Sequence, residues 1–298
     1  MSEVSALPNV PEIAQPRFRE SRRIARVMFG RWVVVGGTLM ILALTATALF
    51  APLIAPYGPN EQDLNNILAP PSKSHLLGTD EVGRDLLTRV IYGSRISLLV
   101  GLVAVTIAAI IGMGLGLVAG YLGGWTNIII MRCIDGLLAL PPLVLMLAFT
   151  AILGGGLINV LIALGIGMMP TYCRLMCGQV ITLKGSDYIT AARAAGASDL
   201  SIMVRHLLPN SLPPLFVLIT LNLGTAIMME ASLSFLGVGI TPPTATWGAM
   251  VSSGYRFILT NPLISFTPGM ALLLVVLSFN MAGDGLRDAL DPRLRGMV

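Results

Sequence analysis

Charged residues are scarce in this chain. Asp, Glu, Lys and Arg make up only 11% of its 298 residues, whereas hydrophobic residues make up 55%. A soluble domain carries roughly a quarter charged residues, and here the deficit is concentrated in long uncharged runs. This pattern excludes an ordinary soluble domain and indicates a membrane protein. The net charge of +4 does not point to nucleic acid, because the basic residues lie beside the apolar runs.

Cysteine and histidine are also scarce. The three cysteines, Cys133, Cys173 and Cys177, lie in or beside apolar segments, and the chain has only two histidines. This pattern favours small apolar side chains within helices over a disulfide framework or a metal site. The sequence also has no Walker A, HExxH or GxSxG motif. We therefore expect no catalysis within this chain, no metal and no cofactor.

Six apolar runs are each long enough to cross a bilayer, for which a helix needs about 20 residues. They cover residues 32–55 and about 95–120, 134–153, 157–181, 213–236 and 263–282. The predicted fold class is an all-α polytopic membrane protein with six transmembrane helices. The predicted segments are an N-terminal tail (1–31), a first transmembrane helix (32–55), an external segment (56–94), a core with five more transmembrane helices (95–283) and a C-terminal tail (284–298).

The distribution of basic residues predicts that both termini are cytoplasmic. Basic residues gather in the N-terminal tail, at Arg132, in a polar island after the fourth run, and at Arg287, Arg293 and Arg295. The predicted external loops hold fewer of them, and most of these lie in one longer loop where the positive-inside rule is weakest.

The second apolar run carries a ladder of small residues. They recur at every fourth position, which places them on one helix face: Ala104, Ala108, Gly112, Gly116 and Gly120. In a membrane, such a face allows two helix backbones to approach closely. We expect it to pack against another helix.

The polar island, residues 184–212, predicts two short helices joined by a turn. Ser186 and Asp187 can cap the first helix, and Gly196 can end it in the left-handed conformation. Ser198 or Asp199 can cap the second helix, which Pro209 is expected to end. Two such helices also describe a DNA-reading module, but the island has only three basic residues against two acidic ones. We therefore expect no nucleic acid partner.

Several ionisable residues call for an interpretation. Arg132 and Asp135 are three residues apart and can pair on a helix, either as a structural or buried ion pair or with a role in coupling or in the translocation path. Glu230 lies inside an apolar run, where a carboxylate costs on the order of 3 kcal/mol. It is expected to line a translocation path, to make a buried hydrogen bond or to lie near the external surface.

Residues 78–85 lack the spacing of a calcium loop and predict a structured external turn.

The polar island resembles the "EAA" loop of bacterial ABC importer permeases, which docks into a groove on the ATPase subunit. Thr190 departs from the family pattern, in which this position is usually glutamate. The resemblance implies a coupling surface formed by Thr190, Ala191, Ala192, Gly196, Ala197, Leu208 and Pro209. Further stretches resemble the oligopeptide, dipeptide and nickel branch of the family, and they lie at 75–85, 131–135, 138–141, 233–239, 242–248 and 280–292.

The resemblance implies a type I ABC importer permease fold in the bacterial inner membrane. It further implies a heterodimer with a homologous second permease, two ATPase subunits and an extracytoplasmic solute-binding protein. ATP binding would close the ATPases, and the docked loop would turn that closure into opening of the path. The implied solute is a dipeptide or oligopeptide, and this subunit itself would be non-catalytic.

Two alternatives remain open from the sequence. The same architecture imports nickel or another small solute such as glutathione, and in this family the binding protein largely sets specificity. A protein of a different class, a self-contained secondary carrier, commonly shows internal repeats and broken helices with ionisable groups at the midplane. The sequence shows no convincing repeat, and Glu230 is its only candidate coupling carboxylate.

Overall fold

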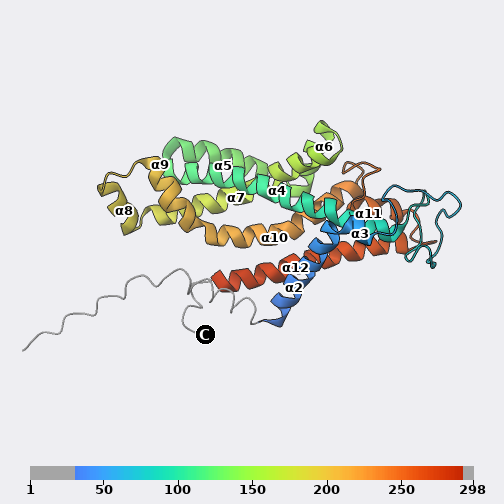
Figure 1. The fold of residues 1–298 in the computed structure, drawn as a ribbon. Coiled ribbons are helices and arrows are strands. Elements are labelled where there is room, and N and C mark those ends of the chain that lie inside the picture. Colours follow the sequence, from blue (N-terminus) through green and yellow to red (C-terminus); the bar gives the residue numbers. More distant parts are fainter. Residues whose placement is uncertain (1–30, 291–298) are drawn as a thin grey trace, which may run out of the picture.

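The computed structural model describes residues 31–290, which form an elongated helical bundle (Figure 1). Five helices are long and apolar enough to cross a membrane. They are α2 (Trp32–Leu49), α4 (Leu86–Leu122), α7 (Leu157–Lys184), α10 (Leu208–Phe235) and α12 (Leu263–Leu290). The bent pair of α5 (Gly124–Leu138) and α6 (Pro142–Leu153) passes the same test when its two helices are taken together, which gives up to six crossings. The prediction of an all-α polytopic bundle is confirmed, with five to six candidate crossings.

Shorter helices lie at the two ends of the bundle. One end carries α8 (Asp187–Ala194), α9 (Asp199–Ser201) and the π-helical segment η1 (Ile202–Leu207). The other end carries α3 (Ala51–Ile54) and α11 (Trp247–Tyr255). The sequence analysis did not predict α11, whose first turn is capped by the Thr246 hydroxyl accepting from Ala249 N.

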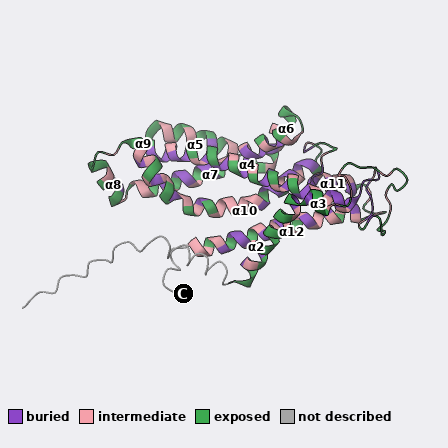
Figure 2. Ribbon diagram, viewed as in Figure 1, coloured by how far each residue is buried: buried purple, intermediate pink, exposed green. Residues whose placement is uncertain are grey.

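The core of the bundle forms where α4 packs along α7. Buried residues follow these two helices and gather again beside α11 (Figure 2). Ala104 and Ala108 of α4 are fully buried, as are Leu164 and Tyr172 of α7. Close packing of this pair makes α4 and α7 the central unit to which the other helices attach.

Two helices extend beyond the predicted boundaries. Helix α4 begins at Leu86, inside the predicted external segment 56–94, because the Asp85 carboxylate caps it by accepting from Thr88 N at 2.8 Å. Its 37 residues span about 55 Å, well beyond a hydrocarbon core of about 30 Å, so its first turns can project out of the membrane. Helix α12 likewise continues past the predicted residue 283 to Leu290.

The third crossing is not the single helix predicted for residues 134–153. Helix α5 starts earlier, at Gly124, and ends at Leu138, and α6 turns away from it by 91°. Pro141 and Pro142 explain the break, because neither ring nitrogen can donate to a preceding carbonyl and each proline disfavours helical geometry in the residue before it.

Most of the predicted N-terminal tail (1–30) and the end of the C-terminal tail (291–298) lie outside the described residues. The cytoplasmic placement of the two termini, which rests on the arginines in these tails, therefore stays a prediction. At the edge of the described part, Arg31 pairs with Asp288 and so joins the start of α2 to the end of α12.

Candidate functional site

The loop predicted to couple to a partner lies at one end of the bundle, between α7 and α10 (Figure 1). Its first helix, α8, ends in a Schellman arrangement of hydrogen bonds. Gly196 N donates to the oxygen of Arg193 at 3.0 Å, and Ala197 N donates to that of Ala192 at 3.1 Å. Gly196 has a φ of +82°, which only glycine adopts at no steric cost. The local turn thus has the geometry expected for Gly196.

The residues of the predicted coupling surface are largely accessible. Thr190, Ala191, Gly196 and Pro209 are exposed, and Ala192, Ala197 and Leu208 are half-buried. Leu208 and Pro209 lie in the first turn of α10, directly after η1, against which α8 packs. Ile189 is the buried residue that anchors α8.

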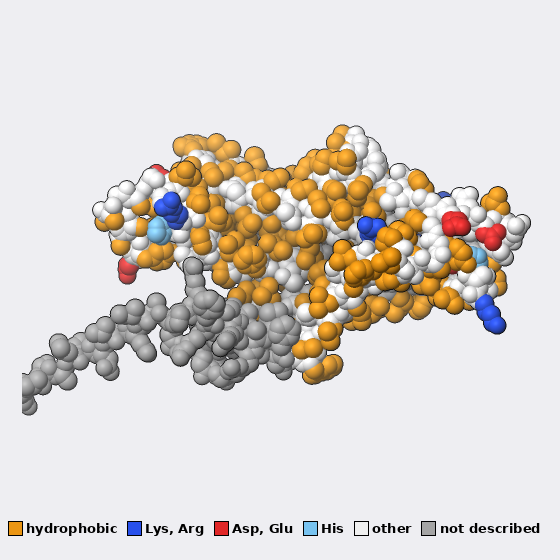
Figure 3. All heavy atoms as spheres, viewed as in Figure 1, with side chains coloured by type: hydrophobic (Ala, Val, Ile, Leu, Met, Phe, Trp, Pro, Cys, Tyr) orange, Lys and Arg blue, Asp and Glu red, His pale blue; other side chains and the backbone are white. Residues whose placement is uncertain are grey.

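Three large hydrophobic side chains on this loop are exposed: Tyr188 by 41%, Leu200 by 70% and Val204 by 49%. Exposed apolar groups beside polar ones are typical of a protein interface. On the visible face of the molecule, most charged side chains lie at the two ends and hydrophobic ones cover the middle (Figure 3). The loop therefore combines features of a docking surface at a polar end of a membrane bundle.

The prediction that the second short helix ends at Pro209 is wrong. A continuous helical stretch runs from Asp199 to Phe235. Ser198 caps its start by accepting from Ser201 N. The π-helical segment η1 explains the continuity, because Leu208 N donates five residues back to Met203 O and so accommodates the proline that follows in the first turn of α10. The loop is therefore mechanically continuous with the fifth crossing.

Tyr121, at the end of α4, ties both sides of the loop together. Its hydroxyl donates to the Asp199 carboxylate, and its backbone oxygen accepts from Lys184 Nζ at 2.6 Å. The Lys184 ammonium also lies 5.4 Å from the centre of the Tyr121 ring. Sequence reasoning missed this residue, because its partners are 63 and 78 positions away.

The glycine ladder lies directly against α7. A Cβ atom at Gly112 would lie 2.5 Å from Met169 O, and one at Gly116 would lie 2.4 Å from Cys173 O. One at Gly120 would lie 2.8 Å from the Val180 side chain. The two backbones are so close that no other residue fits without a shift of one helix. Helix α7, which leads into the loop, is thus held tightly to α4.

Glu230 is fully buried in α10. Its Oε1 accepts from Ser234 Oγ at 2.7 Å, and its Oε2 has no hydrogen-bond partner among the described residues. Oε2 lies beside the start of α11, where a Cβ at Gly248 would be 3.2 Å away. Of the three expected roles, this geometry corresponds to the buried hydrogen bond.

The ion pair predicted between Arg132 and Asp135 is absent from the structure. The Asp135 carboxylate instead lies 2.5 Å from the Arg174 guanidinium of α7, and no ion pair of Arg132 occurs in the described part of the chain. The packing of α5 on α7 brings Arg174 within reach across the helix interface. Both partners are well exposed, with 57% of the Arg174 side chain and 45% of the Asp135 side chain accessible.

The segment between α3 and α4, residues 55–85, is here termed the cap segment. It contains a buried charge network in which Asp80 accepts from Arg84 at 2.7 Å and lies 3.4 Å from Arg89. His75 Nδ1 lies 3.0 Å from Asp85. No cluster of potential metal ligands occurs among the described residues. Residues 78–85 thus form a structured turn.

Hydrogen bonds also order the accessible part of the cap segment. The Asn66 amide donates to one Asp63 oxygen at 2.7 Å, and Asn65 N donates to the other at 3.0 Å. These bonds favour the charged carboxylate and hold the pKa of Asp63 below its ordinary value.

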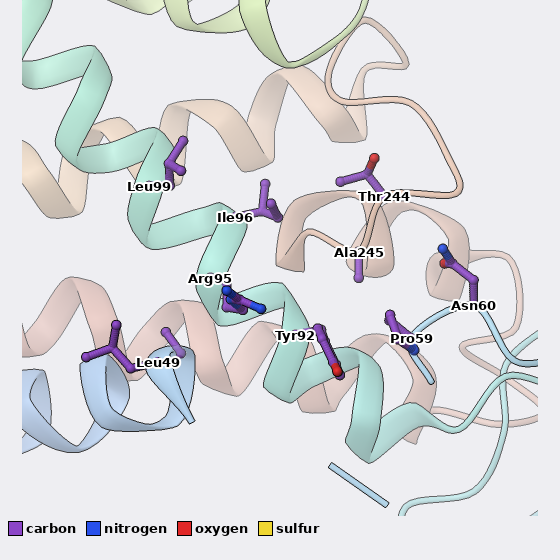
Figure 4. Close-up of a pocket in the computed structure, with 10 residues that line it drawn as sticks. Leu49, Pro59, Asn60, Tyr92, Arg95, Ile96, Leu99, Thr244 and Ala245 are labelled. Carbon is purple, nitrogen blue, oxygen red and sulfur yellow. The ribbon is translucent and has the colours of Figure 1, made fainter. Parts of the chain in front are cut away.

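A cavity of about 500 Å³ opens beside the cap segment (Figure 4). Its walls come from α2, from the first turns of α4 and from the loop before α11, and they carry mainly apolar side chains with Tyr92, Arg95 and Thr244. A second cavity, of about 600 Å³, lies between α7, α10 and α12 near the opposite end and includes Gln179, Asn210 and Arg287.

The described residues thus form a bundle of five to six candidate crossings, with an exposed loop between α7 and α10 that is tethered through Tyr121. The chain belongs to the family of binding-protein-dependent transport system inner membrane components, whose model matches residues 112–296. A second model, the N-terminal transmembrane domain of oligopeptide transport permease C, matches residues 21–71. The protein is therefore a permease subunit of an ABC importer, a non-catalytic role in which partner ATPases hydrolyse ATP.

Individual relatives are similar over most of their length. A di/tripeptide transport system permease protein of Pseudomonas aeruginosa is 48% identical over 88% of each chain. A probable D,D-dipeptide transport system permease protein of Escherichia coli is 43% identical, over 95% of this chain and 94% of the relative. A glutathione transport system permease protein of Pectobacterium atrosepticum is 42% identical, over 92% and 91%.

A solved structure shows the same fold. The inward-facing MetNI methionine ABC transporter contains a chain that is 22% identical to this one and superimposes with a TM-score of 0.56. The alignment covers 69% of this chain and 98% of that chain. At this level of identity the likeness supports the fold of the core alone.

Proposed function

We propose that this protein is the permease subunit of a bacterial importer that carries dipeptides and oligopeptides across the inner membrane. The observation that carries the proposal is the exposed loop 184–212, which follows α7, is held by Tyr121 and continues into α10 without a break from Asp199 onward. The relatives named for di/tripeptides and dipeptides support a peptide as the solute. Those named for glutathione support that compound as the second candidate.

The geometry supports a direct mechanical route from the loop to the membrane core. A partner ATPase that moves α8 also moves Lys184 and Asp199, and both contact Tyr121. Because α4 and α7 are in backbone contact along the glycine ladder, they move together. Closure of the ATPases therefore tilts a rigid pair of helices and opens the path on the opposite side.

The complete importer proposed here contains four further subunits. A homologous second permease forms a heterodimer with this chain, two ATPases bind the loops, and an extracytoplasmic binding protein delivers the peptide. Both termini and loop 184–212 lie in the cytoplasm, and the cap segment lies outside. In this orientation Arg31, Lys184, Arg193, Arg205 and Arg287 lie on the cytoplasmic side, as the positive-inside rule favours.

Cysteine labelling tests the orientation. A cysteine at Ser198, which is exposed, is expected to react with a membrane-impermeant thiol reagent only from the cytoplasm. One at Ser74, exposed in the cap segment, is expected to react only from outside. Reversed labelling would overturn the six-crossing orientation.

Purification of the assembled complex tests the function. The tagged chain, expressed with its neighbouring genes and extracted in mild detergent, is expected to retain a second permease and ATPases. Its ATP hydrolysis is expected to rise with a binding protein loaded with dipeptide. Recovery of the chain alone, with gradient-driven uptake in liposomes, would instead establish a secondary carrier. Stimulation by glutathione and not by dipeptides would favour the second candidate.

A further inference from the structure

The ion pair between Arg174 and Asp135 lies along the length of the candidate crossings, away from their ends at the loop. Arg174 is ten residues, or about 15 Å, before Lys184 at the end of α7. Asp135 is eleven residues, or about 16 Å, after Gly124 at the start of α5. The contact of Lys184 with Tyr121, next to the start of α5, places these two helix ends at one level. Both charges thus lie about 15 Å from the loop end of these helices, a distance within the thickness of a hydrocarbon core of about 30 Å.

Lipid is an unfavourable environment for this pair. A charged residue at the bilayer centre costs about 2.5–3.5 kcal/mol on insertion scales. Yet the Arg174 and Asp135 side chains are 57% and 45% accessible in this chain. Their exposed atoms must therefore face another protein surface or water.

On the α7 side, the surface around the pair is open and free of large hydrophobic side chains. Thr171 and Gly178 of α7 are exposed one turn before and after Arg174. Neither Gly178 nor Gly136, next to Asp135, has an atom within 4 Å of its Cβ position. Throughout α7, which is described in full, no large hydrophobic side chain is exposed between Ile162 and Ile181.

The exposed face of α4 has the opposite character. Its large exposed residues are hydrophobic, among them Leu99, Leu102, Ile110 and Ile111, and they suit contact with lipid. These two faces thus differ: the face of α7 beside Asp135 exposes small and charged residues, and that of α4 exposes large hydrophobic ones. We define the polar strip as Thr171, Arg174 and Gly178 of α7 together with Asp135 of α5.

The end of α5 adds a further polar feature at the same depth. Asp135 lies in its last turn, three residues before the helix ends at Leu138. The final carbonyl groups of a helix carry partial negative charge, which favours a cation nearby. In many secondary transporters, the solute site lies at a broken helix. The 91° break between α5 and α6 follows Leu138, three residues or about 5 Å beyond Asp135.

We propose that Arg174 and Asp135 line the translocation path and bind the two charged ends of a passing peptide. The Arg174 guanidinium binds the peptide carboxylate, and Asp135 with the end of α5 binds the ammonium group. This ligand assignment rests on the peptide substrate proposed above. The solutes named for the relatives share this chemistry, because dipeptides, tripeptides and glutathione all carry a free amine and a free carboxylate.

Transport by the reconstituted complex tests the ligand. In proteoliposomes with the full complex and a loaded binding protein, Arg174→Gln and Asp135→Asn are each expected to lower dipeptide uptake per ATP hydrolysed at least tenfold. Stimulation of ATP hydrolysis by the binding protein is expected to persist, and Arg174→Lys, which keeps the charge, is expected to recover most of the uptake. The matched control is Asp288→Asn, which removes the other exposed interhelical ion pair, that with Arg31, and is expected to leave the ratio unchanged.

Thiol labelling tests the location independently of the solute. In a Cys133→Ser background, Thr171→Cys in the assembled complex is expected to react with a charged, membrane-impermeant thiol reagent at least 100-fold faster than Leu102→Cys. Dipeptide supplied with the binding protein and ATP is expected to slow the reaction of Thr171→Cys only.

Two results would overturn the inference while the proposed function stands. One is a complex that imports peptide but leaves Thr171→Cys as unreactive as Leu102→Cys, because the strip is then covered by the second permease. The other is normal uptake per ATP by both charge variants. A wild-type complex that imports no peptide but reacts at Thr171→Cys would overturn the proposed function and the ligand, and would support the location of the path.

Discussion

The cap segment and loop 184–212 lie at opposite ends of the bundle, and they differ in how their charged side chains are held. In and next to the cap segment, five ionisable side chains are buried and paired: His75, Asp80, Arg84, Asp85 and Arg89 are each at most 9% exposed. In the loop, Asp187, Arg193 and Arg205 are exposed, and so are the hydrophobic residues Tyr188, Leu200 and Val204.

This difference indicates that the two ends of the bundle are stabilised by different contacts. The cap segment satisfies its polar groups internally, so its structure depends on this chain alone. The loop is anchored by Ile189 and Tyr121 and leaves apolar side chains accessible, so we expect a bound partner to cover them. Substitutions in the cap segment should therefore change stability, and those in the loop should change coupling.

The largest effect is expected at Gly196. Gly196→Arg places a side chain where φ is +82°, at a backbone cost of about 1–2 kcal/mol, and directs its bulk toward the docked ATPase. We expect no detectable peptide uptake, measured in cells at normal expression. Gly196→Asn is the matched control, because asparagine tolerates left-handed geometry, and it should retain substantial uptake. Wild-type uptake by Gly196→Arg would show that the loop does not dock through this turn.

The next largest effect is expected in the cap segment. Asp80→Asn leaves two arginines, Arg84 and Arg89, buried beside a neutral amide. Loss of one partner of a buried ion pair costs about 3–5 kcal/mol. We expect a lower unfolding temperature in detergent and faster proteolysis between residues 56 and 85. The control is Glu81→Gln, a neighbouring half-buried carboxylate without an ion pair in the structure. Equal stability of the two variants would contradict the role assigned to the network.

Local patterns in the sequence predicted much of the fold. Apolar runs gave the number of crossings, and the spacing of Gly112, Gly116 and Gly120 indicated a close helix contact. Gly196 could be assigned to a helix end because that motif depends on a few adjacent residues. The break after α5 also had a local signal in Pro141 and Pro142, and the length of the apolar run concealed it.

The contacts that the sequence analysis did not predict join residues that are distant in the sequence. The pairing of Asp135 with Arg174 spans 39 positions, and that of Tyr121 with Asp199 spans 78. Helical spacing favoured Arg132 as the partner of Asp135, because only neighbours on the same helix are visible to a periodicity argument. Packing between helices decides such pairs, and it depends on the tertiary fold.

A smaller effect is expected at Tyr121. Tyr121→Phe keeps the ring beside Lys184 and removes the hydrogen bond to Asp199, which is exposed to solvent, at a cost of about 1 kcal/mol. We expect faster hydrogen exchange at residues 199–207 and fewer peptides imported per ATP. Tyr188→Phe is the control for exchange, because no hydrogen bond of its hydroxyl occurs in the described structure. Unchanged exchange in Tyr121→Phe would mean that this bond does not hold the loop.

The smallest effect on the chain itself is expected at Leu200, and it sharpens the comparison most directly. Leu200 in the loop is 70% exposed and Leu64 in the cap segment is 69% exposed, so serine at either position should change the stability of the isolated chain by no more than about 0.5 kcal/mol. Burial of a leucine in an interface contributes about 1.5–3 kcal/mol. If only the loop is completed by a partner, Leu200→Ser should weaken binding of the ATPase about tenfold or more, whereas Leu64→Ser should not. Equal ATPase affinity of both variants would mean that exposure at the loop does not mark a docking surface.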